Sequence, residues 1–411
     1  MNMSENASAI ATSNSETFAV GGELGTSASK FCCEDTVVLF SSVVGDSLTE
    51  AMETSWRHMN RSTDTRWIRN LAVFDDNRNA WRYVGAMTRR SEKTDWFTHK
   101  GLITNYDDAF VAIKAGLFLL SLEIEKKGKK LDRVGLGFGI TVRHGENVIE
   151  KFFSYIKEHL VERDGKKFLL IKAKNVASNE VREIEIQLDF SVMQYQAYGA
   201  YMALLFSKYN MAVQNTYVVD IGHGTWIKLP VVENEAEIGL SDSFTEGIFT
   251  ITRNIANVIF ESSGQKFKIP EQRLMERLPS KDYKIEVPGA GVFDFSKLLE
   301  QQTTILAREI GDKVAADVAS LSSKGQAIDY FIIIGGGAHL LFDKIKKNIG
   351  DYFGWPEDVV NQRVLDAKAT GVDSRHINCV GFMLLARDQI AMDQGKDVEP
   401  GFTVTNIVQE F

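Results

Sequence analysis

Hydrophobic and polar positions along the chain predict alternating strands and helices. Short runs rich in β-branched and other apolar residues predict strands, at 36–45, 131–140, 166–174, 181–188, 217–221, 226–232 and 330–334. Hydrophobic residues at helical spacing predict helices, at 105–125, 146–160, 194–207, 244–261, 270–278, 296–321 and 376–392. The segment 46–60 has irregular spacing and the tail 393–411 shows no period, so neither is assigned an element. The pattern indicates an α/β fold.

One predicted strand ends in an acid followed by a glycine turn. The sequence Tyr-Val-Val-Asp-Ile-Gly-His-Gly-Thr-Trp at 217–226 places Asp220 just before Gly222 and Gly224. Since the glycines carry no Cβ, successive backbone N–H groups can converge on an anion, and the carboxylate can hold a magnesium ion or water. The alternative from this stretch alone is an ordinary glycine-rich hairpin after a buried strand.

Two further stretches have the same character. Glu-Leu-Gly-Thr-Ser-Ala-Ser-Lys at 23–30 follows a short apolar segment, and its hydroxyls and lysine suit a polyphosphate. Five apolar residues at 330–334 run into Gly335, Gly336 and Gly337, and a helical pattern follows. Such a strand–turn–helix junction lets a phosphate or a nucleoside approach the backbone closely.

Taken in this order, the three stretches resemble the phosphate-1, phosphate-2 and adenosine motifs of the actin superfamily, which also includes the sugar kinases and the DnaK-type chaperones. Within the superfamily, the chain is most similar to the plasmid-segregation actins of the ParM/StbA type. Other segments that resemble those proteins lie at 40–45, 82–90, 134–138, 196–200 and 375–382. The resemblance implies an α/β, actin-like two-lobe fold in which each lobe is a βββαβα (ribonuclease-H-like) core with a small inserted subdomain.

The resemblance also implies a division of the chain. We expect a disordered leader at 1–16 and a tail at 395–411. The first lobe would span 17–212, with a small subdomain at about 46–100, and a C-terminal helix at about 373–394 would complete it. The second lobe would span 213–372, with a small subdomain at about 264–324.

The family motifs imply roles for individual residues. Gln196, Asp220 and Glu23 would be catalytic, with Glu23 and Asp220 holding Mg²⁺ through water and Gln196 orienting the attacking water. ATP would be bound by residues of the three turns, which are Gly25, Thr26, Ser27, Lys30, Gly222, His223, Gly224, Thr225, Gly335, Gly336, Gly337 and Ala338. Glu23 replaces the usual aspartate, and His223 and Trp226 also depart from the family pattern, so we expect a changed rate of ATP hydrolysis.

Composition narrows the classes of function. The chain has 411 residues, 44% of them hydrophobic, which favours two lobes over one average domain. Its formal net charge of −8 argues against direct nucleic-acid binding, which needs a basic face. Cys32, Cys33 and Cys379 lack the spacing of a zinc site or a disulfide framework. No apolar run approaches the ~18 residues of a membrane span, so we expect a cytoplasmic protein with no membrane partner.

Two other motifs leave alternatives open. Gly135-x-Gly137-x-Gly139 is a weak match to a dinucleotide-binding fingerprint, because the third glycine is not at the fingerprint spacing. The segment 61–100 interleaves tryptophans with Arg61, Arg66, Arg69, Arg78, Arg82, Arg89 and Arg90. That pattern is compatible with nucleic-acid binding, but in an acidic chain it favours a small subdomain whose arginines meet solvent or an acidic neighbouring subunit.

The leading hypothesis is an actin-like ATPase that binds Mg-ATP in the interlobe cleft and polymerises head to tail into filaments. By resemblance, its role would be plasmid or phage DNA segregation through a DNA-binding adaptor protein. The alternatives are a nucleotide-binding structural filament with weak hydrolysis, a small-molecule kinase of the same superfamily and a chaperone-type nucleotide switch. The kinase would need a general-base aspartate for which the sequence has no motif, and the chain lacks room for the chaperones' peptide-binding domain.

Overall fold

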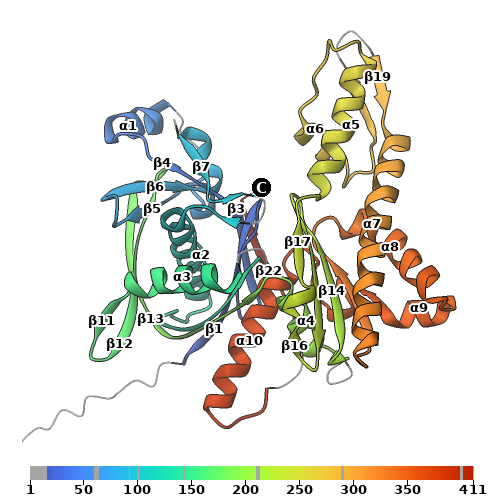
Figure 1. Cartoon of the computed structure of the whole chain (residues 1–411). Coiled ribbons are helices and arrows are strands. Elements are labelled where there is room, and N and C mark those ends of the chain that lie inside the picture. The colour runs from blue at the N-terminus through green and yellow to red at the C-terminus, as the bar shows by residue number, and fades with distance from the viewer. Residues whose placement is uncertain are drawn as a thin grey trace, which may run out of the picture.

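The computed structural model of the protein consists of two lobes that lie side by side (Figure 1). The structure describes residues 16–59, 64–91, 93–99, 102–141, 145–209, 213–287, 291–398 and 401–410. Residues 1–15 of the predicted leader and Arg61 of the arginine-rich segment lie outside the described residues. Among the described residues, no helix combines the length and the apolar character that a membrane crossing requires.

The first lobe is built on a twelve-stranded sheet. Its strand order is β22 (Asn406–Gln409), β3 (Thr36–Ser41), β2 (Ala28–Cys33), β1 (Phe18–Leu24), β10 (Arg133–Ile140), β13 (Glu180–Tyr195), β12 (Lys166–Asn175), β5 (Leu71–Asp75), β6 (Ala80–Val84), β4 (Val43–Asp46) and β7 (Thr94–Trp96), with β11 (Val161–Arg163) paired to β12. β1, β2 and β3 pair antiparallel, and β10 lies parallel to β1. Both faces are apolar, since Phe31 and Cys33 of β2 enter one core and Cys32 enters another.

Helices cover both faces of this sheet. α2 (Tyr106–Lys126) and α3 (Gly145–Glu158) pack on one face, and α4 (Tyr198–Leu205) and α10 (Ile377–Asp393) pack on the other. Asn105 caps α2 by accepting a hydrogen bond from the Asp108 N–H, so the helix predicted at 105–125 is confirmed. The small hairpin of β8 (Thr98–His99) and β9 (Leu102–Ile103) precedes α2.

The second lobe repeats this order of elements on a six-stranded sheet. The strands run β16 (Glu235–Ala236), β15 (Trp226–Val232), β14 (Thr216–Ile221), β20 (Tyr330–Ile334) and β21 (Val364–Asp366), with β17 (Asp242–Phe244) paired to β15. Its helices are α5 (Ile248–Ser262), α6 (Glu271–Met275), α7 (Ser296–Ser323), α8 (Ala338–Phe353) and α9 (Glu357–Arg363), and β18 (Lys284–Val287) pairs with β19 (Gly291–Asp294) as a separate hairpin. β20 lies parallel to β14, as β10 lies parallel to β1 in the first lobe.

The two lobes meet along α4 and α10, which cross each other and share one core with β14, β15 and β20 of the second lobe. A Cβ added to Gly381 of α10 would overlap the backbone oxygen of Gly199 of α4, so the crossing requires glycine. α10 also packs against β1, where a Cβ on Gly21 would overlap the oxygen of Cys379. The helix predicted at 376–392 is present as α10, which packs on the sheet of the first lobe.

Several predicted boundaries differ from the observed ones, and one of them concerns Gln196. The helix expected from Gln194 begins only at Tyr198, because Gln194 and Tyr195 still pair with β10. The alternation of hydrophobic and polar residues therefore continues further than the sequence indicated, and Gln196 lies in the turn between the end of β13 and α4.

Helix α1 (Glu50–Met59) was not predicted, because its hydrophobic stripe is interrupted by a charged residue. Glu53 and Trp56 are buried on its inner face. The Glu53 carboxylate accepts hydrogen bonds from Tyr83, at 2.8 Å, and from Lys174. A buried acid with two donors replaces the apolar residue that a periodicity search expects.

Strand β22 was also missed, in the tail that was expected to have no element. It pairs in parallel with β3, whose residues lie about as far away in the sequence as the chain allows, so no local turn signals it. The buried Glu410 that follows accepts hydrogen bonds from the Ser41 N–H at 2.9 Å and the Ala86 N–H at 2.6 Å. The tail thus ties β3 to the small subdomain of the first lobe.

Candidate functional site

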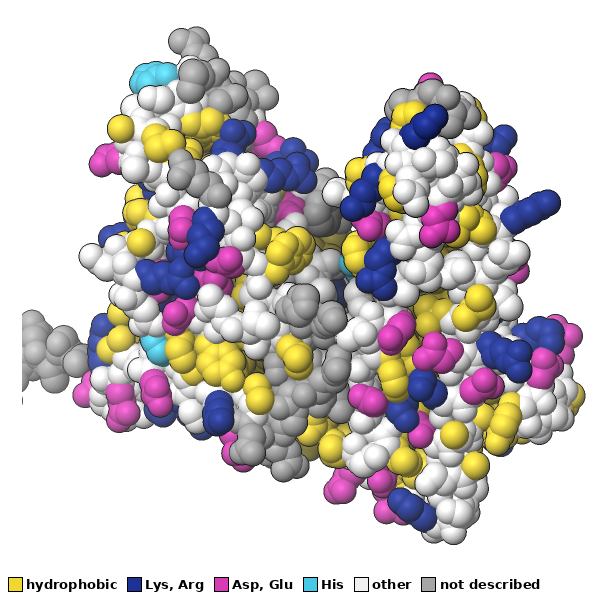
Figure 2. All heavy atoms as spheres, turned by 45° about the horizontal axis from the view of Figure 1, so that its top comes forward, with side chains coloured by type: hydrophobic (Ala, Val, Ile, Leu, Met, Phe, Trp, Pro, Cys, Tyr) yellow, Lys and Arg dark blue, Asp and Glu magenta, His cyan; other side chains and the backbone are white. Residues whose placement is uncertain are grey.

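A cavity of about 470 Å³ lies between the two lobes, and all three glycine turns line it. The space-filling view shows the molecule hollowed between its lobes (Figure 2). The predicted site residues that line the cavity are Glu23, Gly25, Thr26, Ser27, Lys30, Gln196, Asp220, Gly222, His223, Thr225, Gly335, Gly336 and Gly337. Gly224 lies beside the first turn, since a Cβ there would be 3.3 Å from Thr26 Cγ2, and Ala338 is buried at the start of α8. The fold therefore brings three segments that are distant in sequence to one cleft.

The first turn joins β1 and β2. Gly25 donates its N–H to the Ala28 oxygen at 3.1 Å, and a Cβ on Gly25 would lie only 2.8 Å from that oxygen. Glu23 and Lys30 are opposite each other in the antiparallel pair, so both side chains reach the same side of the hairpin. The turn thus presents a carboxylate and an ammonium next to backbone that is free of Cβ atoms.

The second and third turns pack against each other in the second lobe. Gly222 donates to the Thr225 oxygen at 2.7 Å, and Gly337 donates to the Ile221 oxygen at 2.8 Å. Gly335 has φ +93°, and a Cβ there would overlap both Asp220 Oδ1 and the Ile221 oxygen. Only glycine permits this close approach of the third turn to the acid at the end of β14.

Asp220 is buried, and one side chain from the first lobe holds it. Asn378 of α10 donates its amide to Asp220 Oδ2 at 2.7 Å, while the Asn378 Oδ1 accepts the Ala200 N–H of α4 at 3.1 Å. Burial, followed by the charge of Glu23, raises the pKa of Asp220 to about 6. Asn378 therefore connects the acid of the second lobe to the helix that follows Gln196.

Glu23 accepts hydrogen bonds from two other polar side chains of the first lobe, Lys30 and Gln196. Its Oε2 accepts a hydrogen bond from Lys30 Nζ at 3.1 Å, and its Oε1 accepts one from the Gln196 amide. Burial alone lowers the pKa of Lys30, but the charges of Glu23 and Asp220 outweigh burial and the net shift is upward. The amide that the resemblance assigns to water orientation is thus held by a protein carboxylate.

The acidic groups of the cleft suit a divalent cation. Glu23 and Asp220 are both buried. Burial and then the charge of Glu23 raise the pKa of Asp220, and Lys30 only partly offsets them. No group of three or more potential metal-ligating side chains occurs among the described residues. Two carboxylates with water and phosphate oxygens are a usual environment for Mg²⁺, so this donor set fits that ion rather than a site closed by protein ligands alone.

His223 and Trp226, the two residues near the second turn that depart from the family pattern, have different surroundings. The His223 side chain lines the cleft, and burial lowers its pKa, which keeps the imidazole neutral. Trp226 is fully buried and stacks on Phe244 at a centroid distance of 4.1 Å. Trp226 therefore belongs to the core behind the turn, whereas His223 faces the site.

Sequence reasoning missed several residues of the cleft. One end has an apolar wall from the α6 region, formed by Met275, Leu278 and Pro279, while Ser41 and Gln409 line the cleft from the first lobe. A flat apolar group of a ligand would pack against these three side chains. Residues 375–382 had been matched to the family, and the position of Asn378 in that segment was the available signal for its role.

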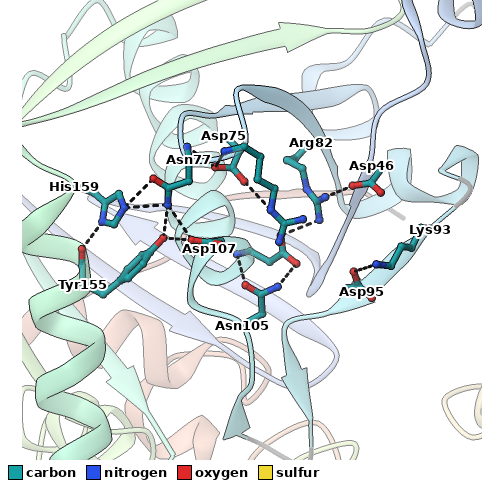
Figure 3. A network of polar contacts seen from close by, with 12 residues as sticks. Asp46, Asp75, Asn77, Arg82, Lys93, Asp95, Asn105, Asp107, Tyr155 and His159 are labelled. Carbon is teal, nitrogen blue, oxygen red and sulfur yellow. Dashed lines mark hydrogen bonds and ion pairs between the residues drawn. The ribbon is translucent and has the colours of Figure 1, made fainter.

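The arginine-rich segment lies in the small subdomain of the first lobe, away from this cleft. Arg82 is buried and donates to Asp46 (Figure 3) and to Asp108 at 2.9 Å. Arg66 and Arg69 pair with Asp64, and Arg78 pairs with Asp75. Arg89 and Arg90 have no acidic partner among the described residues. Most of the arginines therefore serve the subdomain itself, which argues against an extended basic face for nucleic acid.

Comparisons with known proteins bear on the fold. The family model described as archaeal actin homologue MreB-like, C-terminal, matches residues 218–347. A search of curated proteins finds no significant match.

Solved structures match nearly the whole chain at low sequence identity. A 15-stranded ParM filament from Clostridium botulinum has a TM-score of 0.64 and 16% identity, covering 91% of this chain and 99% of that one. The archaeal actin homologue Ta0583 has a TM-score of 0.62 and 17% identity, covering 90% and 99%. ParM from Bacillus thuringiensis, solved with ATP, has a TM-score of 0.57 and 14% identity, covering 91% and 99%. The predicted two-lobe fold is confirmed.

Proposed function

We propose that this actin-superfamily protein binds Mg-ATP in the cleft between its lobes, hydrolyses it and assembles head to tail into cytoplasmic filaments. The observation that carries the proposal is the convergence of the three glycine turns on one cleft with Glu23, Lys30, Gln196 and Asp220. Nucleotide-bound and filament structures of proteins with this fold support it.

Different residues of the cleft would bind the phosphates, the base, the metal ion and the attacking water. Lys30 and the backbone N–H groups of the turns would hold the phosphates, and the apolar wall near Met275 would contact the base. Mg²⁺, when bound by Glu23 and Asp220 through water, would supply neutralisation of the charge on the transferred phosphoryl group. Gln196 would orient the attacking water once its amide leaves Glu23.

Slow hydrolysis is a second candidate within the same proposal. Glu23 is one methylene longer than aspartate and contacts Gln196 and Lys30 together. Hydrolysis then requires the Glu23–Gln196 hydrogen bond to break before a water can be oriented. A filament that binds ATP and turns it over slowly is the expected consequence.

The test is sedimentation and phosphate release on purified protein. Protein at increasing concentration is mixed with magnesium and ATP, with magnesium and AMPPNP, or with ATP and a chelator. We expect pelleting above a critical concentration with either nucleotide when magnesium is present, and phosphate release with ATP only. Pelleting with little phosphate release selects the slow filament, whereas neither pelleting nor phosphate release overturns the proposal.

We further propose that the filaments segregate plasmid or phage DNA through a DNA-binding adaptor. The net charge of −8 and the internal pairing of most arginines support an indirect contact with DNA. Assembled protein should therefore leave duplex DNA in the supernatant at physiological salt. Co-pelleting of DNA with the pure protein would remove the need for an adaptor.

A further inference from the structure

A basic surface lies at one end of the first lobe. The short helix η2 (Gly85–Arg90) ends in Arg89 and Arg90, which are both exposed. The guanidinium of Arg90 lies 4.2 Å from the ring centre of Trp56 on α1, which holds the side chain in place, and no acid among the described residues pairs with it. We call Trp56, Arg89 and Arg90 the arginine surface.

The arginine surface borders a hollow of about 550 Å³. The acids of this hollow already have partners within the chain. Asp64 pairs with Arg66 and Arg69, and the Glu410 carboxylate accepts hydrogen bonds from Ser41 and Ala86. The charges that remain available to a ligand are therefore those of Arg89 and Arg90, which suit a protruding acidic group.

The second lobe carries a turn of that kind between β15 and β16. Glu233, Glu235 and Glu237 occur within five residues, and none of them has an ion pair among the described residues. Ile238 beside them is 42% exposed. We call residues 233–238 the acidic hairpin.

The acidic hairpin is held in one conformation. Glu233 and Asn234 have φ of 53° and 69°, the left-handed values of a tight hairpin turn. Tyr198 donates its hydroxyl to the Asn234 oxygen at 2.8 Å, and Tyr201 donates to Asn234 Oδ1. Since both tyrosines belong to α4, the backbone that carries the glutamates is held on a fixed support and loses little freedom on binding.

The two surfaces lie at opposite ends of the molecule. In Figure 1, α1, which carries Trp56, is at the upper end of the first lobe, and β16 is at the lower end of the second lobe. Within one molecule they are therefore apart. A second molecule in the same orientation brings unlike surfaces together when the lower end of its second lobe is placed over the upper end of the first lobe of the molecule below. Such a heterologous contact leaves a free surface at each end and propagates instead of closing.

We propose that the arginine surface docks on the acidic hairpin of a second copy of this chain. The inference rests on the proposed function, because it names the contact through which the filament grows. At a net charge of −8 per chain, copies repel one another overall, so a local pairing of unlike charges decides their orientation. Arg89 and Arg90 are exposed, as are Glu233 and Glu235, while Glu237 is partly buried. The contact should therefore weaken as salt shortens the range of the attraction.

Two charge-reversal variants and their mixture test this contact. The hairpin variant is Glu233→Lys with Glu235→Lys and Glu237→Lys, and the arginine variant is Arg89→Glu with Arg90→Glu. Each variant alone juxtaposes like charges, so we expect its critical concentration to rise by about tenfold or more at low salt. An equimolar mixture should assemble near the wild-type concentration, because each end of one variant complements the other variant.

A matched control carries the same change in charge at another place. Glu150→Lys, Glu158→Lys and Glu162→Lys alter exposed glutamates of α3 and β11 that have no ion pair among the described residues. This control should assemble like the wild type. Nucleotide binding by all variants, measured by ultrafiltration, confirms that they are folded.

The outcomes separate the contact from the proposed function. If the wild type does not pellet with nucleotide, the proposed function fails. If the wild type pellets and the mixture remains as defective as the two separate variants, the arginine surface and the acidic hairpin do not meet, and the inference is overturned. Wild-type assembly of either variant alone overturns it as well.

Discussion

Replacing Asp220 with asparagine should stabilise the nucleotide-free protein while removing its response to magnesium. The substitution keeps the shape of the side chain and an oxygen that can accept the Asn378 amide. It removes a buried negative charge next to Glu23. An acid that binds a ligand is expected to cost stability in the absence of that ligand, and the Asp220→Asn variant measures this cost.

The magnitude follows from the pKa of Asp220, which rises from 3.8 to about 6 through burial and the charge of Glu23. The difference corresponds to about 3 kcal/mol in the free energy of unfolding. The sign follows because the folded protein holds the proton more tightly than the unfolded chain. The contribution of Asp220 to stability is therefore fully present below about pH 4 and is lost as the pH rises through about 6.

Melting curves across pH provide the assay. The difference in melting temperature between Asp220→Asn and the wild type should be small at pH 4 and should grow to a plateau above pH 7. Added Mg-ADP should raise the melting temperature of the wild type, and a chelator should abolish that rise. The melting temperature of Asp220→Asn should not respond to magnesium or to the chelator. A matched control is Asp317→Asn, since Lys228 at 2.6 Å and Tyr217 at 2.5 Å already compensate that buried carboxylate.

Asp317→Asn should therefore destabilise the protein. The reasoning on Asp220 is refuted if the wild type is the more stable protein at pH 8, or if the difference does not change with pH. Either result would mean that the charge of Asp220 is compensated in the folded protein.

Two further substitutions test the cleft, and a third tests the crossing of α4 and α10. Glu23→Asp shortens the carboxylate that holds the Gln196 amide, so phosphate release should rise severalfold, and an unchanged rate would mean that the site is adapted to glutamate. Gln196→Ala should slow phosphate release by about a hundredfold or more while assembly with ATP persists, and weaker nucleotide binding instead would contradict its role. Gly381→Ala places a methyl group on the Gly199 oxygen and should abolish soluble expression or lower the melting temperature strongly, whereas Gly239→Ala, which meets nothing within 4 Å, serves as its control.

Local sequence pattern was sufficient for the strand ends and turns of the site. Apolar runs that only a buried strand explains lead to Asp220, the acid before one glycine turn, and to the three glycines that begin at Gly335. Hydrogen bonding within each turn, such as Gly222 to Thr225, involves residues a few positions apart. The sequence therefore determined the turns that we propose as the phosphate site, together with the two-lobe fold class.

The tertiary structure alone decided which of these groups touch. The Glu23 contact with Gln196, the Asn378 contact with Asp220 and the Ser41 contact with Glu410 each join residues more than 150 positions apart. No periodicity encodes such pairs, because they depend on sheet register and on the crossing of α4 and α10. The tertiary structure also decided two elements that the sequence did not reveal. Helix α1 has a polar inner face because the packed molecule buries Glu53 there, and strand β22 pairs with a strand that is distant in sequence. In both cases the packed molecule, and not the neighbours in sequence, sets burial and pairing.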